Sequence, residues 1–323
     1  MARRSKGRPI NGVLLLNKQE GLSSNNVLQR AKAIYYAQKA GHTGALDPLA
    51  TGMLPICFGE ATKFSQFLLD TDKTYIVRAK LGVRTTTSDS QGDVVCKKPV
   101  EVTQAQIEDA IKTFEGISDQ YPSMYSALKY EGRPLYKYAR EGIEVPRKCR
   151  KINVFSLTFD EFDSGTNEIQ MTAHVSKGTY IRTIIDDLGE LLGCGAHVIM
   201  LHRSKVGNYP SEQMVTLDQI QELLDRGKKS ESDKREQISA DAYIVLDTLL
   251  LPMDTAVADL KEVNISEKDG RFFANGRSIF IKGLQEGVVR VTAGSAKTFI
   301  GVGEKNAKGE LKAKRTLESL QPQ

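Results

Sequence analysis

Residues 41–63 read GHTGALDPLATGMLPICFGEATK, and Asp47 stands in this stretch among glycines and prolines. Pro48 and Pro55 fix their own φ angles and push the residues before them, Asp47 and Leu54, toward extended conformations. Glycine permits backbone angles that other residues avoid, and the stretch contains Gly41, Gly44, Gly52 and Gly59. This composition leaves little room for a regular helix or strand and predicts a shaped loop that carries Asp47.

A loop of this kind suits an active site, because loops held by a rigid scaffold carry a large share of catalytic residues. Asp47 offers a carboxylate and His42 an imidazole within the same short stretch. The alternative is structural, since aspartate is also a favoured turn and helix-cap residue. The loop alone leaves both interpretations open.

The composition describes an ordinary globular protein with a basic bias. Of the 323 residues, 40% are hydrophobic and 26% are charged, which is typical of a folded chain, and the length predicts about two domains. The net charge of +5 and the pI of about 8.8 favour a polyanionic partner.

Basic residues are concentrated in one segment, which we expect to form an RNA-gripping insertion at about residues 124–152. Residues 126–151 contain eight basic and three acidic residues, and residues 121–138 contain five tyrosines. Lysine and arginine bind phosphates, and tyrosine rings stack on unpaired bases. The alternative is a solvated surface loop whose tyrosines pack inward. The candidates for RNA backbone contacts are Lys129, Arg133, Arg140, Lys148, Arg150 and Lys151.

Cysteines and histidines indicate neither a metal site nor a disulfide framework. The four cysteines are far apart, and the four histidines show no metal-ligand spacing with them. No apolar run approaches the roughly 18–20 residues that a membrane-spanning helix needs. We therefore expect a cytoplasmic protein with no membrane segment.

The hydrophobic pattern predicts an α+β fold with a mixed or antiparallel sheet. Strands are expected at residues 12–16, 75–81 and 169–175, where apolar residues form a run or alternate. Helical spacing predicts one helix from residue 24 to about residue 40 and another from residue 181 that ends at Gly193. The strands outnumber parallel βαβ units, which favours hairpin connections with helices on the sheet faces.

The character of the chain changes after Pro252. Short apolar runs such as RSIFI and VVRVT alternate with glycines from there to the C-terminus, which predicts a small all-β module. The domain boundaries we expect are 1–250 for the larger domain and 251–323 for the module.

Residues 41–63 resemble, nearly position for position, the active-site motif of the tRNA pseudouridine-55 synthases of the bacterial TruB type. Three further segments resemble the same family in the same order: KTYIVRAKLGVRTTTSDSQGDVV (73–95), YSALKYEGRPLYKYAREG (125–142) and VSKGTYIRTIIDDLGELLG (175–193), followed by Leu201-His202-Arg203. The resemblance implies the pseudouridine synthase fold with a C-terminal RNA-binding module of the PUA type. It also implies isomerisation of uridine 55 in the tRNA T loop, without metal or cofactor.

The resemblance also implies roles for individual residues. Asp47 matches the catalytic aspartate, and Arg182 matches the arginine that pairs with it. Tyr75 matches the active-site tyrosine, Tyr180 and Leu201 match residues that line the uracil pocket, and His42 is expected to fill the space left by the flipped base.

The expected partner is the T stem-loop of tRNA, bound by a monomer that requires no protein partner. A tRNA-folding chaperone or RNA-binding scaffold is the alternative function, and an RNA-guided enzyme inside a ribonucleoprotein is a third. A carboxylate among phosphates repels RNA, so Asp47 favours the enzyme. The basic segment favours a protein that grips its own substrate.

Overall fold

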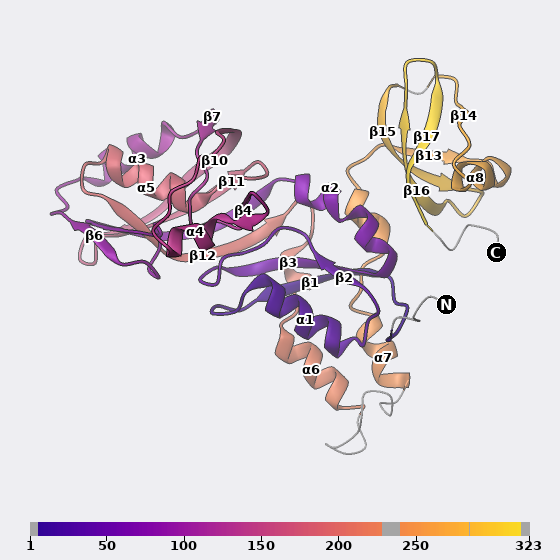
Figure 1. The fold of residues 1–323 in the computed structure, drawn as a ribbon, viewed down its shortest axis with the longest axis horizontal. Helices are drawn as coiled ribbons and strands as arrows, with labels where there is room; N and C mark the ends of the chain where they lie inside the picture. The colour runs from indigo at the N-terminus through magenta and orange to yellow at the C-terminus, as the bar shows by residue number, and fades with distance from the viewer. Residues whose placement is uncertain (1–5, 228–239, 284, 318–323) are drawn as a thin grey trace.

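The computed structural model describes residues 6–227, 240–283 and 285–317, which form a large sheet with helices and a smaller C-terminal sheet (Figure 1). The eight-stranded sheet has the order β1-β3-β12-β4-β11-β10-β7, and β2 also pairs with β3. Its strands are β1 (Gly12–Lys18), β2 (Ala40–His42), β3 (Thr51–Phe58), β4 (Lys73–Leu81), β7 (Gly116–Gln120), β10 (Arg150–Asp163), β11 (Glu168–Val175) and β12 (Ala196–Val206).

Neighbouring strands of this sheet are antiparallel except β12 and β3, which are parallel where His202 lies opposite Thr51. Helices lie beside this sheet or beside each other (Figure 1), and their buried side chains join one continuous core with the sheet. These are α1 (Ser24–Ile34), α3 (Gln104–Lys112), α5 (Ile181–Leu191), α6 (Leu217–Asp225) and α7 (Ala240–Asp247). The predicted α+β class with a mixed sheet is confirmed.

Alternation of side chains decides which face of the sheet is covered. Along β11, Ile169, Met171, Ala173 and Val175 are buried, and the residues between them are partly exposed. Helix α5 buries Ile181, Ile184, Ile185 and Leu188, the spacing of one helical face. Its end is as predicted, because Gly193 adopts the left-handed φ of 78° that glycine tolerates best.

Short elements connect the large ones. They are η1 (Gly59–Phe64), α2 (Ser65–Asp70), the pair β5 (Val83–Thr85) and β6 (Val94–Lys97), and η2 (Ser211–Gln213). The basic segment folds into the hairpin β8 (Lys129–Tyr130) and β9 (Arg133–Pro134), followed by α4 (Leu135–Arg140), and then leads into β10.

The C-terminal sheet has the order β13-β15-β16-β17-β14 and its own buried cluster around Phe273, Val291 and Leu311. Its elements follow η4 (Met253–Val257) and are β13 (Glu262–Ile265), α8 (Glu267–Ala274), β14 (Ile279–Phe280), β15 (Gly287–Ala293), β16 (Thr298–Lys305) and β17 (Glu310–Thr316). The prediction of an all-β module is wrong at α8. Helix α8 begins after Ser266, whose side chain caps it by accepting a hydrogen bond from the Asp269 N–H. The glycine-rich pattern of the sequence obscured this cap.

Two further predictions need correction. The first helix ends at Ile34 rather than near Ala40, because Tyr36 adopts a φ of 49° and the chain then enters β2. The shaped loop is shorter than 41–63, because β3 occupies Thr51–Phe58. Gly52 serves close strand packing there, since a Cβ on it would lie 2.3 Å from the Arg203 carbonyl oxygen.

Among the described residues, no helix is both long enough and apolar enough to cross a membrane.

Candidate active site

The Asp47 loop spans residues 43–50 between β2 and β3 and is fixed by neighbouring segments. The Leu46 N–H donates to the Ser24 hydroxyl at 2.7 Å, and this hydroxyl donates to the Leu46 carbonyl at 3.1 Å. The Gly21 N–H donates to the Pro48 carbonyl at 2.9 Å. Since Ser24 begins α1, that helix holds the residue directly before Asp47.

Two buried cations lie beneath this loop, and sequence reasoning missed both roles. The Lys18 ammonium donates to the carbonyls of Pro48 at 3.1 Å and Ala50 at 2.6 Å. The Arg203 guanidinium donates to the carbonyls of Met53 at 2.7 Å and Gly44 at 3.1 Å. Burial lowers the pKa of Lys18 to about 8, and the Asp47 charge opposes this shift. The sequence offers no signal for such contacts, because the acceptors are backbone carbonyls.

Arg182 joins the loop to the start of α5. Its Nε lies 2.9 Å from Oδ2 of Asp47, and its side chain is only 4% exposed, against 39% for Asp47. The other guanidinium nitrogens donate to the carbonyls of Thr87 at 2.9 Å and Tyr125 at 3.0 Å. The guanidinium therefore has a fixed orientation, and it leaves part of the Asp47 carboxylate open.

A second acid, Asp89, also contacts Arg182, and the sequence analysis did not identify it. Its Oδ2 lies 3.3 Å from Nη1 of Arg182, and its side chain is 5% exposed. The Thr87 hydroxyl and the Gln91 N–H donate to its other oxygen at 2.6 and 3.0 Å. Asp89 lies within the motif of residues 73–95, but only the fold reveals that this acid is buried beside Arg182.

Burial and the charges of Arg182, Asp89 and Lys18 set the protonation of Asp47, and the Lys18 charge lowers its pKa. Burial raises its pKa above the ordinary aspartate value, Arg182 lowers it, and the Asp89 charge raises it. Because part of the carboxylate is solvated, water reduces the cost of its ionisation. An oriented, ionised carboxylate can act as a nucleophile or as a base.

Three other predicted site residues lie directly before α5, in β4 and in β12. Tyr180 directly precedes α5, two residues before Arg182, and burial raises the pKa of its phenol. Tyr75 and Val77 lie on the same face of β4, and Leu201 of β12 stands opposite Val77. Tyr75 is partly buried, and Leu201 is buried in the main core.

His42 ends β2 and is half-buried. Its Nδ1 is buried and has no hydrogen-bond partner among the described residues. Burial lowers the pKa of His42, and the nearby Arg203 charge lowers it further. Both effects favour the neutral imidazole.

The six basic candidates extend from the β8–β9 hairpin to the start of β10. Lys129, Arg140, Lys148 and Lys151 are exposed, whereas Arg133 and Arg150 are half-buried. Arg133 pairs with Glu141 and lies over the Tyr138 ring, and Arg140 lies over the Tyr136 ring. Lys151 pairs with Asp119 at 3.6 Å. The tyrosines thus pack partly against arginines of the same segment.

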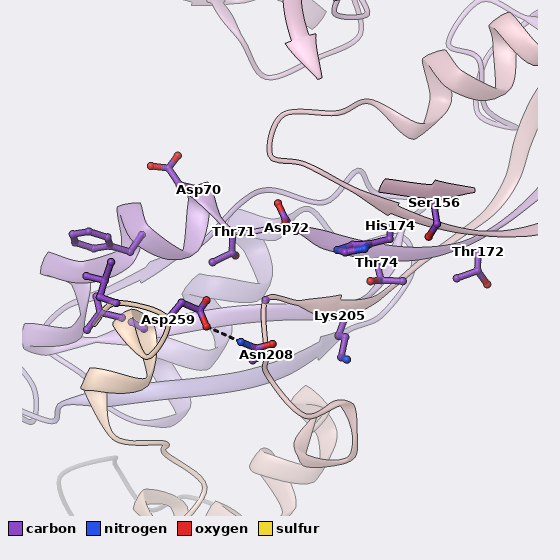
Figure 2. Close-up of a pocket in the computed structure, with 15 residues that line it drawn as sticks. Asp70, Thr71, Asp72, Thr74, Ser156, Thr172, His174, Lys205, Asn208 and Asp259 are labelled. Carbon is purple, nitrogen blue, oxygen red and sulfur yellow. Dashed lines mark hydrogen bonds between the residues drawn. The ribbon is translucent and has the colours of Figure 1, made fainter. Parts of the chain in front are cut away.

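A groove of about 660 Å³ with mixed polar and apolar lining lies elsewhere on the sheet, beside α2 and η4 (Figure 2). Thr74, His174 and Lys205 line it, together with Asp72 and Asp259. Because Thr74 and Tyr75 are adjacent in β4, their side chains point to opposite faces. None of the candidate site residues lines this groove.

Within the ranges that the structure describes, no three His, Cys, Asp or Glu side chains are grouped so that they could hold a metal ion.

Three protein-family models match successive parts of this chain between residues 32 and 317. Residues 32–181 match the model described as TruB family pseudouridylate synthase (N terminal domain), and residues 182–258 match the tRNA pseudouridylate synthase B C-terminal domain. Residues 262–317 match the model described as Pseudouridine synthase II TruB, C-terminal.

Relatives match along almost their full length. The chain is 66% identical over 322 residues to tRNA pseudouridine synthase B of Pseudoalteromonas translucida (strain TAC 125), covering 99% of this chain and 98% of the relative. It is 58% identical over 318 residues to tRNA pseudouridine synthase B of Vibrio parahaemolyticus serotype O3:K6 (strain RIMD 2210633), covering 98% of each.

Solved structures share the fold at lower identity. The similar chain in an H/ACA ribonucleoprotein bound to a substrate RNA containing 2'-deoxyuridine gives a TM-score of 0.70 at 22% identity, over 100% of this chain and 93% of that chain. The similar chain in a Cbf5-Nop10-Gar1 complex gives 0.67 at 24% identity, over 91% and 78%. These likenesses support the sheet architecture and the C-terminal module, and the sequence matches show that this chain belongs to the TruB family of pseudouridine synthases.

Proposed function

We propose that this protein is a tRNA pseudouridine synthase that isomerises uridine 55 in the T loop of tRNA. The names of its relatives, tRNA pseudouridine synthase B, support the reaction and the class of RNA. The position within tRNA follows from the motif resemblance. The observation that carries the proposal is the partly open Asp47 carboxylate held by a buried Arg182.

The reaction breaks the bond between N1 of uracil and C1' of ribose and forms a bond between C5 and C1'. The proton on C5 leaves and N1 gains a proton, so nothing is oxidised or reduced. The Asp47 carboxylate assists either by attacking the substrate or by removing a sugar proton. Both routes require ionised Asp47, and neither requires a metal or an organic cofactor.

We assign the remaining predicted site residues to extruding and binding the target uracil. A uridine inside a folded loop must be flipped out before its glycosidic bond is accessible, at a cost of a few kcal/mol. The proposed role of His42 is to fill the vacated stack, which suits a neutral, half-buried imidazole. Tyr75, Tyr180 and Leu201 are proposed to hold the extruded uracil.

Binding of tRNA is assigned to the basic segment, with Lys129, Arg133, Arg140, Lys148, Arg150 and Lys151 as phosphate contacts. We further propose that residues 1–250 form the catalytic domain and residues 251–323 a PUA-like RNA-binding domain. The separate sheet and core of the C-terminal part support this division. We also propose that the protein is a cytoplasmic monomer and needs no protein partner.

The test is pseudouridine mapping over a whole unmodified tRNA transcript, together with a matched transcript in which uridine 55 is replaced by cytidine. The proposal predicts one modified position in the first transcript and none in the second. Modification at a different uridine would contradict the assigned position. Binding without any product would favour the chaperone function.

A further inference from the structure

Gln120 makes a two-point contact with the backbone of Tyr180. Its side-chain Nε2 donates to the Tyr180 carbonyl at 3.1 Å, and the Tyr180 N–H donates to its Oε1 at 2.8 Å. Gln120 is 6% exposed, although it ends β7, whose other four residues are exposed. An amide side chain that pairs in both directions reproduces the contact that a neighbouring strand would make.

The backbone at Tyr180 needs such support because it lies between regular elements. Tyr180 is extended, with φ −98° and ψ 106°, and no side chain caps the helix that follows it. The Ile184 N–H also donates to the Tyr180 carbonyl, but only at 3.3 Å. Gln120 therefore contacts both backbone polar groups of the residue directly before α5.

Tyr180 lies two residues before Arg182, whose Nε lies 2.9 Å from Oδ2 of Asp47. The segment that follows Gln120 also contacts this guanidinium, because Arg182 donates to the carbonyl of Tyr125 at 3.0 Å. Residues 120–125 lead into the basic segment. Gln120 thus stands where the proposed RNA-binding segment joins the residues that orient Asp47.

We propose that Gln120 is a positioning residue for the isomerisation, whose amide sets the backbone of Tyr180 and thereby the guanidinium that orients Asp47. The kinetic part of this inference rests on the proposed function. The structural part, that Gln120 fixes the Tyr180 backbone, is measurable without activity.

The kinetic test uses Gln120→Leu, which keeps much of the shape and removes both hydrogen bonds. The single-turnover rate constant at saturating tRNA should fall by about tenfold to 100-fold, because small misplacements of catalytic groups are costly. The dissociation constant for tRNA should stay within about twofold. The matched control is Gln106→Leu, which removes side-chain bonds to Thr103 before α3 and should retain the wild-type rate.

A double-mutant cycle separates positioning from general destabilisation. If Gln120 acts through Arg182, Gln120→Leu should slow an Arg182→Met protein by less than about threefold, because the interaction it supports is already absent. If the double variant instead shows the product of the two single-variant rate losses, the inference is overturned. A wild-type rate constant in the Gln120→Leu single variant would also overturn it.

Amide hydrogen exchange gives the independent measurement. In Gln120→Leu the Tyr180 amide should exchange at least about tenfold faster than in the wild type, while α3 amides keep their protection. Unchanged exchange at Tyr180 would overturn the inference even if no reaction were observed. An inactive wild type with the expected exchange would contradict the proposed function and support the positional role of Gln120.

Discussion

Nε of Arg182 lies 2.9 Å from Oδ2 of Asp47, although the two residues are 135 positions apart in the chain. The arginine is buried at the start of α5, and the aspartate sits on the loop between β2 and β3. A buried guanidinium with carbonyl and carboxylate partners on its other nitrogens has little freedom to rotate. The carboxylate therefore meets a substrate in one orientation.

Replacing Asp89 by asparagine should slow the reaction without loss of tRNA binding. The change preserves shape but removes the charge 3.3 Å from Nη1 of Arg182, so the guanidinium is held less firmly. We expect the single-turnover rate constant to fall by about tenfold or more, equivalent to about 1.4 kcal/mol of barrier. Asp93→Asn, an exposed neighbour, is the control. Equal rates for both variants would show that Asp89 does not orient Arg182.

The acid limb of the pH–rate profile should report Asp47. Its carboxylate must be ionised, so activity falls as the pH drops through its pKa, which burial raises and Arg182 lowers. The Asp89 charge raises this pKa, and Asp89→Asn should therefore move the midpoint of the limb to lower pH. Single-turnover rates across the acid range measure this. A midpoint that stays in place or moves to higher pH would contradict the assignment.

His42→Ala should slow formation of the product at a step before bond cleavage. Flipping costs a few kcal/mol, so losing the residue that fills the stack should lower the single-turnover rate constant by about tenfold. Because burial lowers the pKa of His42, the loss should be the same at pH 7 and pH 8. His174→Ala is the control, because His174 lies opposite Thr74 and therefore on the face of the sheet away from Tyr75. A loss that disappeared at one of these pH values would indicate proton transfer instead.

Removing charge from the basic segment should change the salt dependence of binding. In a Lys148→Gln, Arg150→Gln, Lys151→Gln protein, tRNA binding should weaken, and the slope of log affinity against log salt should decrease by about 0.7–0.9 for each phosphate that the variant no longer binds. Titrations at several salt concentrations provide the slope. The control removes three positive charges elsewhere, at Lys97, Lys98 and Lys112. If the two triple variants had the same slope, the cluster would lie away from the RNA.

The sequence predicted most of the fold because the burial pattern is local. Alternation at Ile169, Met171 and Ala173 predicted β11, and the spacing of Ile184 and Leu188 predicted α5. The errors arose where tertiary packing decides the conformation. Gly52 indicated a loop, but it lies in a strand that passes close to the Arg203 backbone.

The candidate site was predictable only where a motif marked it. Asp47 and Arg182 lie in two separate motifs, the family resemblance implied that they pair, and the fold places their side chains 2.9 Å apart. Lys18, Asp89 and Gln120 were missed because each acts through a partner distant in sequence. Two of these partners are backbone groups, which carry no residue type for a pattern to reveal.

The role of Asp47 is tested most directly by pseudouridine mapping at position 55 of an unmodified tRNA transcript, with wild-type protein and with Asp47→Asn. Binding of the transcript is measured in parallel, without added metal or nucleotide. We predict pseudouridine with the wild type, none with Asp47→Asn, and similar tRNA affinity for both. Wild-type levels of product from Asp47→Asn, with tRNA bound, would contradict the account.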